Sequence, residues 1–319
     1  NSSNGKSLLA NTLLLNTQKM GGIPILFDEE NSTDISLLVK MGLKVGDEAK
    51  KAGLHKLVYA SAGSVEALFD SMELTIKKIR ETGCKDFITI VWDSIAATPS
   101  KVELEGGYEQ EGYGMQKAKA ISLASRKFTQ FIGRENVLFV FINQLRSGPT
   151  GFGSFEKFSE PGGMTVPFHS TIRLRLVKIE NITISSQKEP IGVKIQAEIK
   201  KNKIAPPMRK CTFNVYFDKG IDDEASWFDN LVEKGIISRP TKMSYELELP
   251  DFSDNSVLKP VKFKSSEWKS IISDKRTREW VKNKVIQANI IDYSNLTPSF
   301  DELIDEVKLT EELVDLEGD

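Results

Sequence analysis

The run FITIVW, residues 87–92, is short and apolar and ends in Asp93 and Ser94. Its length and its β-branched and aromatic side chains are typical of a strand that is buried on both faces. Two further runs have the same character, at Ile23–Phe27 and Val137–Ile142. Because strands buried on both faces occur in sheets that helices cover on each side, the three runs predict an α/β fold.

Helical patterns separate the three runs, at Lys6–Met20, Val65–Glu81 and Lys117–Ile132. Alternation of strand and helix at this spacing predicts a mostly parallel central sheet. Beyond Thr171 the pattern changes to strands without intervening helices, and we expect these to extend the sheet, in part antiparallel. They are Thr171–Lys178, Val193–Lys200 and Cys211–Phe217.

The sequence changes character after Pro250. Residues 265–290 combine apolar side chains, including Trp268 and Trp280, with many charges, which predicts a small C-terminal domain of helices with or without strands. The two tryptophans are expected to anchor it. The predicted parts are a core over residues 1–250, the small domain over residues 251–300, with a linker at Asp251–Pro260, and an acidic tail over residues 301–319.

Charge is divided unevenly along the chain. The formal net charge is −2, but residues 301–319 hold nine acids and one base, so this tail carries −8 and residues 1–300 carry +6. A basic body favours a surface that binds a polyanion. The acidic tail either competes for that surface or only keeps the chain soluble.

Composition excludes several classes of protein. Apolar residues make up 39% of the chain, yet no apolar run approaches the roughly 20 residues that span a bilayer. Cys84 and Cys211 are too few for a disulfide framework, and neither His55 nor His169 has a partner at metal-ligand spacing. We therefore expect a cytoplasmic protein without membrane association, whose histidines and cysteines have no special chemistry.

Each of the three apolar runs ends in acids or amides. Because the carboxyl ends of parallel strands meet at one edge of a sheet, we expect these polar side chains to converge where ligands bind in open α/β folds. They are Asp28, Glu29 and Glu30 after the first run, Asp93 after the second, and Asn143 and Gln144 after the third.

The segment NGKS, residues 4–7, matches the second half of a phosphate-binding loop, GxxxxGK[ST], and precedes a helical pattern. In such a loop the backbone N–H groups cradle phosphates, the lysine meets the β- and γ-phosphates, and the hydroxyl holds Mg²⁺. We expect Lys6 and Ser7 in the last two roles. The first glycine would lie before Asn1, so the sequence is expected to begin inside the motif. The other predicted phosphate contacts are Asn4, Gly5 and Leu8.

Hydrolysis of a nucleotide also needs an acid for the metal ion and a group that orients the attacking water. Asp93, at the end of its strand, is predicted to support Mg²⁺ directly or through water. Glu30 or Glu29 is predicted to orient the water, and Gln144 to sense the γ-phosphate. These residues together predict an ATPase with Mg²⁺ as cofactor.

Several segments resemble the RecA family of DNA recombinases, in the divergent form carried by bacteriophages. They occur in the family's order over roughly residues 1–235, and the asparagine–glutamine pair and the last segment are the most specific to that family. The segments are ILFDEE at residues 25–30, VWDSIAA at 91–97, FINQLR at 141–146, PGG at 161–163 and KNKIAPP at 201–207.

The resemblance implies an ATPase core that binds ATP and Mg²⁺. It also implies a helical homo-oligomeric filament on single-stranded DNA that exchanges strands with double-stranded DNA, in a bacterial cell or a phage-infected host. It makes Glu30 the base that activates water and Gln144 the sensor that links ATP to the DNA loops. Lys201 and Lys203 are implied to reach the γ-phosphate held by the neighbouring subunit. The adenine is expected to contact Asp34 and Phe217.

Two glycine-rich segments are predicted to bind DNA, at about Glu105–Met115 and Leu145–Gly163. Long glycine-containing segments inside a compact domain are functional or simply irregular surface loops, and both readings stay open. Positive and aromatic side chains suit contact with the phosphates and bases of a single strand. Those assigned to DNA are Lys117, Lys119 and Arg126 after the first segment, and Arg146, Phe152, Phe155, Lys157, Gly162 and Gly163 in the second.

Two other functions stay open on the sequence: the motor of a hexameric DNA helicase with the same core fold, and a nucleotide-switched adaptor that has lost hydrolysis. A helicase predicts an arginine finger in a closed ring, whereas Lys201 and Lys203 favour lysines across an open interface. Glu30 and Asp93 argue against the adaptor. Pro167 stands where many RecA proteins carry a lysine, and the family's N-terminal docking helix and strand are not in the sequence. We expect this chain alone to form filaments poorly.

Overall fold

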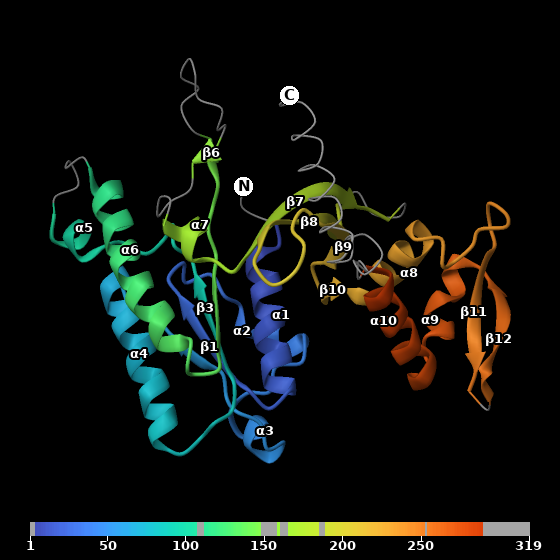
Figure 1. Ribbon diagram of the computed structural model, residues 1–319, viewed down its shortest axis with the longest axis horizontal. Helices are drawn as coiled ribbons and strands as arrows, with labels where there is room; N and C mark the ends of the chain where they lie inside the picture. The colour runs from blue at the N-terminus through green and yellow to red at the C-terminus, as the bar shows by residue number, and fades with distance from the viewer. Residues whose placement is uncertain are drawn as a thin grey trace, which may run out of the picture. The chain divides into compact units, whose positions relative to one another are not determined.

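The computed structural model of the protein describes residues 4–106, 112–147, 158–159, 165–184, 189–252 and 254–289. The chain divides into two compact units, residues 1–223 and 224–319 (Figure 1). The acidic tail predicted over residues 301–319 lies outside the described residues. Within the described ranges, no helix is long and apolar enough to cross a membrane.

A four-stranded parallel sheet, in the order β2-β1-β3-β4, forms the centre of the first unit. Strands β1 (Ile23–Asp28) and β3 (Ile88–Asp93) are buried at every position, as their continuous apolar sequences predict. Their register places the last residue of β1, Asp28, beside the last residue of β3, Asp93. The two outer strands are β2 (Val58–Ala60) and β4 (Val137–Phe141).

Helices cover both faces of this sheet (Figure 1). On one face, α4 (Val65–Glu81) and α6 (Tyr113–Ile132) bury apolar side chains such as Met72 against β1 and β3. On the other face, α1 (Lys6–Lys19) packs through Leu14 against the same strands. The predicted α/β fold with a parallel central sheet is therefore confirmed. Short elements complete this unit: α2 (Ile35–Lys40), α3 (Gly46–Lys51), α5 (Lys101–Glu105), β5 (Arg146–Ser147), β6 (Phe158–Ser159) and α7 (Thr165–His169).

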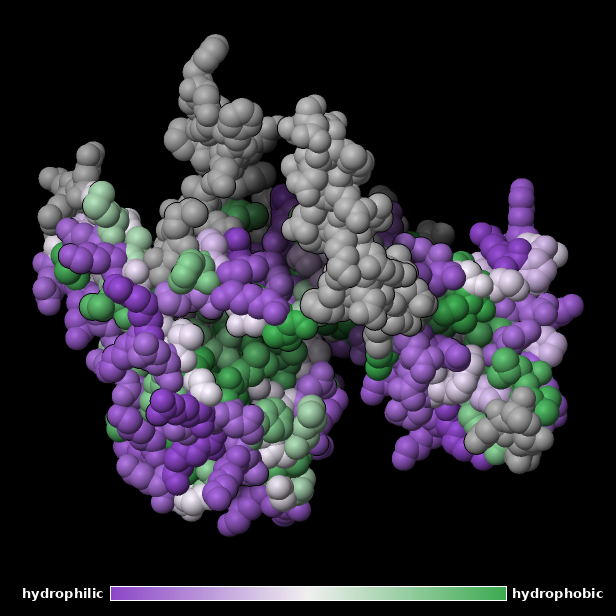
Figure 2. Space-filling model, in the orientation of Figure 1, coloured by the Kyte–Doolittle hydropathy of each residue, from purple (hydrophilic) through white to green (hydrophobic). Residues whose placement is uncertain are grey.

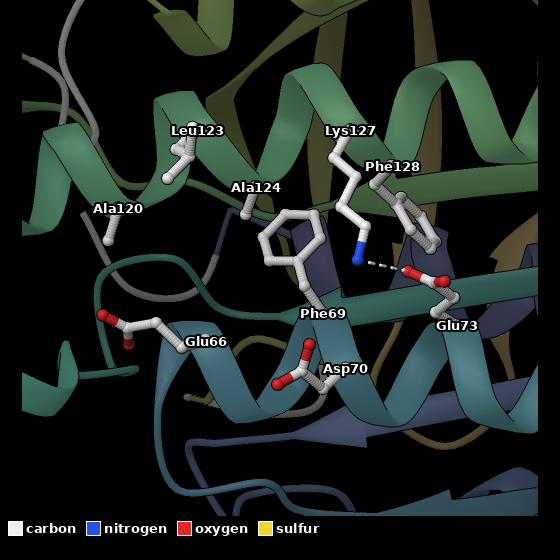
Figure 3. Close-up of a pocket in the computed structure, with 9 residues that line it drawn as sticks. All are labelled: Glu66, Phe69, Asp70, Glu73, Ala120, Leu123, Ala124, Lys127 and Phe128. Carbon is white, nitrogen blue, oxygen red and sulfur yellow. Dashed lines mark ion pairs between the residues drawn. The ribbon is translucent and has the colours of Figure 1, made fainter.

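A groove with a volume of about 430 Å³ lies between α4 and α6 (Figure 3). Phe69 of α4 and Leu123 of α6 contribute its apolar lining, and Lys127 of α6 reaches Glu73 of α4, with 3.1 Å between Nζ and Oε2. Hydrophilic side chains cover most of the outward surface of these helices in the view of Figure 2. The ion pair therefore joins two helices whose buried faces already share one core.

The strands after Thr171 pair in a second sheet, which is antiparallel and has the order β10-β9-β8-β7. Among the described residues, these strands hydrogen bond to one another. The antiparallel part of the fold is therefore a sheet separate from the parallel one. Ile195 and Val215 of this sheet pack against Leu8 in the first turn of α1. The strands are β7 (Ile172–Ile182), β8 (Gly192–Asn202), β9 (Lys210–Tyr216) and β10 (Gly220–Asp222).

In the part of the second unit that the structure describes, three helices, a turn of 3-10 helix and a β-hairpin surround one apolar core. Its largest buried side chains include Leu231, Phe263 and Trp268, and the partly buried Trp280 packs against this core. The elements are α8 (Asp223–Glu233), β11 (Tyr245–Asp251), β12 (Asp254–Phe263), η1 (Ser265–Glu267), α9 (Trp268–Ile271) and α10 (Lys275–Asn289).

The boundary between the units differs from the predicted one at residue 250. Residues 251–260, predicted as a linker, lie in the β11–β12 hairpin, whose register pairs Leu249 with Lys259 and Leu247 with Val261. The apolar residues of β11 alternate with charged ones, which is a strand pattern, but the high charge of the region hides it. Helix α8 joins the second unit because Leu231 is fully buried against this hairpin.

Replacing Trp268 by Ala is expected to lower the free energy of unfolding of the second unit by about 3–5 kcal/mol. The ring is 3% exposed and packs against Phe228 and Phe263, and its N–H donates to the Glu224 carbonyl at 2.7 Å. Urea unfolding, followed by tryptophan fluorescence, measures the effect. Trp280→Ala removes a partly buried ring of the same core and should cost less. Equal losses would contradict this packing.

Candidate functional site

The start of helix α1 has the backbone that a phosphate-binding loop needs. Gly5 has a φ of 71°, in the left-handed region, and a Cβ atom there would lie 2.5 Å from Cδ1 of Ile195. Glycine therefore fits this position where other residues would not. The helix begins at Lys6 and has no side-chain cap. Because the first N–H groups of a helix point toward its N-terminal end, those of α1 point toward the loop.

A cavity of about 240 Å³ lies where the loop meets the carboxyl edge of the parallel sheet. The structure thus brings together residues from the ends of β1, β3 and β4 with those of the loop, as the sequence predicted. Ile142 also lines this cavity, and its side chain supplies an apolar wall. The predicted site residues around the cavity are Asn4, Gly5, Lys6, Ser7, Leu8, Glu30, Asp93 and Gln144.

The two neighbouring glutamates have different partners. Oε1 of Glu29 accepts the backbone N–H of Ala62 at 2.7 Å, and Oε2 accepts the backbone N–H of Gly63 at 3.1 Å and the Ser61 hydroxyl at 3.2 Å. Glu29 therefore fixes the loop after β2. Of the two glutamates, only Glu30 lines the cavity. Glu30 is therefore the better placed of the two candidates for orienting the attacking water.

Glu30 is oriented by two side chains, one that follows β3 and one that follows β4. Its Oε1 accepts the amide N–H of Gln144 at 3.2 Å and the hydroxyl of Ser94. Ser94 is not among the predicted site residues, and its place directly after Asp93 at the end of a buried run is the signal that points to it. The network joins the ends of β1, β3 and β4 through the carboxylate of Glu30.

Asp28 holds the turn after β1 in place through hydrogen bonds of its side chain. Its carboxylate is buried and accepts the backbone N–H groups of Thr33 and Ser32 and the Tyr59 hydroxyl, at 2.9, 3.1 and 2.9 Å. Burial acts to raise the pKa of Asp28, but these hydrogen bonds outweigh it and hold the pKa below its ordinary value. The ionised carboxylate thus stabilises the turn that carries Glu30, and this stability is lost as pH falls through the lowered pKa.

The pKa of Asp93 is shifted in the opposite direction, above its ordinary value. Burial raises its pKa, a hydrogen bond with Ser7 and the charge of Lys6 act to lower it, and the nearby carboxylates of Glu30 and Asp28 raise it further. An acid whose pKa is higher in the folded state binds its proton more tightly there than in the unfolded chain. Stability therefore falls as pH rises from about 3.9, the unfolded value, through the raised pKa of Asp93.

Without Mg²⁺ and nucleotide, Asp93→Asn is expected to raise the midpoint of thermal unfolding at neutral pH, because the amide removes a charge that burial disfavours. Asp28→Asn is the matched control with the opposite sign, and it should cost about 1–3 kcal/mol of stability through lost hydrogen bonds. Thermal unfolding in a chelator measures both. A decrease in the midpoint for both variants would contradict the assigned electrostatics.

The remaining residues predicted to bind nucleotide lie outside the cavity lining. Asp34 caps helix α2 by accepting the Ser36 N–H at 2.8 Å, and Phe217 is 56% exposed in the turn after β9. Lys201 is at the end of β8, where its Nζ donates to the carbonyls of Pro167 and Phe168 at 2.6 and 3.0 Å. Burial lowers the pKa of Lys201, and the neighbouring positive charges of Lys203 and Arg173 lower it further.

The residues assigned to DNA are only partly described. Lys117 donates from Nζ to the Ala96 carbonyl at 3.2 Å, which ties α6 to the turn after β3, while Lys119 and Arg126 are exposed on α6. The backbone of Arg146 opens strand β5. Five of the assigned residues lie outside the described ranges: Phe152, Phe155, Lys157, Gly162 and Gly163.

A parallel sheet, a helix that starts at a phosphate-type loop, and acids at the neighbouring strand ends define the phosphate-loop class of α/β proteins. The family model for the RecA N-terminal domain matches residues 1–222. The chain belongs to the RecA family.

Curated relatives with this family name match about three quarters of the chain. Protein RecA of Geobacter sulfurreducens is 32% identical over 238 residues, which are 74% of this chain and 64% of that protein. Protein RecA of Leptospira meyeri is 33% identical over 238 residues, 74% of this chain and 56% of its own length. Protein RecA of Thermus thermophilus is 31% identical over 239 residues. The matched region is thus 56% to 64% of the length of these relatives.

Proposed function

We propose that the chain is the ATPase core of a DNA recombinase that forms an ATP-dependent filament on single-stranded DNA and pairs homologous strands. The observation that carries this proposal is the cavity in which Lys6, Ser7, Glu30, Asp93 and Gln144 meet. Membership of the RecA family supports it. The likeness of individual segments to the bacteriophage form of the family stays a prediction.

The residues around the cavity divide the chemistry of ATP hydrolysis between them. Lys6 and the first N–H groups of α1 neutralise phosphate charge. A hydroxyl from Ser7 and a carboxylate from Asp93 are the oxygen ligands that Mg²⁺ accepts, and the ion would neutralise charge on the phosphates. Glu30 takes a proton from the water that attacks the γ-phosphorus, while the bond from this phosphorus to the bridging oxygen breaks and ADP leaves. Gln144, which lies between β4 and β5, contacts Glu30.

The connection to DNA is proposed to run through Gln144. The residue follows β4 and precedes β5, and Arg146 and Ser147 of β5 pair with Ser159 and Phe158 of β6. Both strands belong to the second glycine-rich segment, which begins directly after Gln144. A change in what Gln144 contacts would therefore be transmitted directly to the proposed DNA-binding residues.

The experiment measures ATP turnover by the full-length protein with and without single-stranded DNA, together with the salt dependence of DNA binding in ATP and in ADP. We expect DNA to stimulate turnover and ATP to tighten DNA binding, with an affinity that falls steeply as salt rises. Absence of stimulation, together with absence of DNA binding at low salt, would contradict the proposal. Closed rings in electron micrographs would favour a helicase motor.

A further inference from the structure

The structure brings three potential metal ligands together at the edge of the sheet opposite the nucleotide cavity. His55 precedes β2, and Cys84 and Asp86 precede β3. Because β2 and β3 belong to one parallel sheet, the segments that enter them lie at the same edge. Nε2 of His55 is 2.7 Å from Oδ2 of Asp86, and Sγ of Cys84 is 3.4 Å from the same oxygen.

We propose that His55, Cys84 and Asp86 bind a divalent transition metal ion of the zinc type. One ligand atom from each side chain lies within 4.8 Å of the other two. In the part of the chain that the structure describes, no other group of three His, Cys, Asp or Glu side chains meets this condition. Tetrahedral zinc with nitrogen, oxygen and sulfur ligands needs separations of about 3.3–3.6 Å between ligand atoms, so the histidine and the aspartate need to part only slightly.

The backbone that carries the ligands is fixed by side chains outside the cluster. The Arg80 guanidinium donates to the carbonyls of Cys84 and Asp86 at 3.1 and 2.9 Å, and pairs with Glu135. Gln18, which is 1% exposed, donates from Nε2 to the His55 carbonyl at 2.8 Å. Both segments are therefore held in place before a metal binds, which reduces the cost of ordering them.

The chemistry of the three side chains selects the ion. Imidazole, thiolate and carboxylate together suit zinc and similar transition metals, whereas Mg²⁺ prefers oxygen ligands alone. The side chains of His55 and Asp86 are 38% and 53% exposed, so an ion can enter and water can complete its coordination. The contact of His55 with Asp86 at these exposures contributes little to stability by itself and does not account for the position of the Cys84 thiol beside it.

The test uses Co²⁺ as the probe on the full-length protein without nucleotide, because a thiolate bound to Co²⁺ absorbs in the near ultraviolet. We expect one Co²⁺ ion with a thiolate band that Zn²⁺ removes and Mg²⁺ does not. Cys84→Ser should abolish the band, and His55→Ala and Asp86→Asn should each weaken binding about tenfold or more. Cys211→Ser is the matched control, and it should leave the band unchanged.

The midpoint of thermal unfolding gives a second measure of metal binding, separate from the thiolate band. Zn²⁺ should raise the unfolding midpoint of the wild-type protein and of Cys211→Ser, and leave that of Cys84→Ser unchanged. Circular dichroism without metal verifies that each variant is folded. A wild-type protein that binds Co²⁺ without a thiolate band, or a folded Cys84→Ser variant with unchanged affinity, would overturn the proposal.

Discussion

Replacement of Glu30 by Gln is expected to lower ATP turnover by the full-length protein about 10²- to 10⁴-fold, because an amide cannot take a proton from the attacking water. Glutamine has nearly the same size, so the contacts with Gln144 and Ser94 can reform and the cavity keeps its shape. ATP binding should therefore be retained. Single-turnover hydrolysis and equilibrium binding of ATP measure the two quantities separately.

The neighbouring residue supplies the matched control. Glu29→Gln makes the same chemical change one position earlier, where the carboxylate holds the backbone N–H groups of Ala62 and Gly63. We expect this variant to lose about 1–3 kcal/mol of stability but to hydrolyse ATP within a few-fold of the wild-type rate. A larger loss of turnover in Glu29→Gln than in Glu30→Gln would contradict the proposed role of Glu30.

The sequence predicted the first unit well because its signals are local. Strands buried on both faces, such as β1 and β3, are continuous apolar runs, and the polar residues that end them meet at one edge by topology alone. The choice between Glu29 and Glu30 could not be made in this way. It depends on hydrogen bonds with residues 61–63, which lie far along the chain.

Two other features escaped prediction for related reasons. Many residues of β11 and β12 are charged, and the composition of residues 251–260 is typical of a linker. The alternation of apolar side chains in the hairpin is therefore hard to recognise in the sequence. His55 and Cys84 share no motif, and the parallel order of the strands brings their segments to one edge. A spacing rule for metal ligands along the chain cannot find ligands that the sheet brings together.

Changing both Lys201 and Lys203 to Ala is expected to lower DNA-stimulated ATP turnover on the order of 10³-fold, the lower end of what a positive side chain from a neighbouring subunit supplies in phosphoryl transfer. Neither lysine lines the nucleotide cavity of its own subunit. The resemblance to the RecA family implies that both act on the nucleotide of the neighbouring subunit. Lys200→Ala is the matched control, because Lys200 pairs with Glu198 at 2.8 Å in the same strand, and it should retain turnover.

Mixing two inactive variants separates this role from a structural one, since Lys201 also donates to the carbonyl groups that end α7. The double lysine variant keeps Glu30, and Glu30→Gln keeps both lysines. In a mixed filament of the kind we propose, some interfaces combine the intact Glu30 of one subunit with the intact lysines of the next, so turnover should recover. Each variant alone cannot form such an interface. Recovery no greater than the sum of the two separate rates would show that the lysines do not act across the interface.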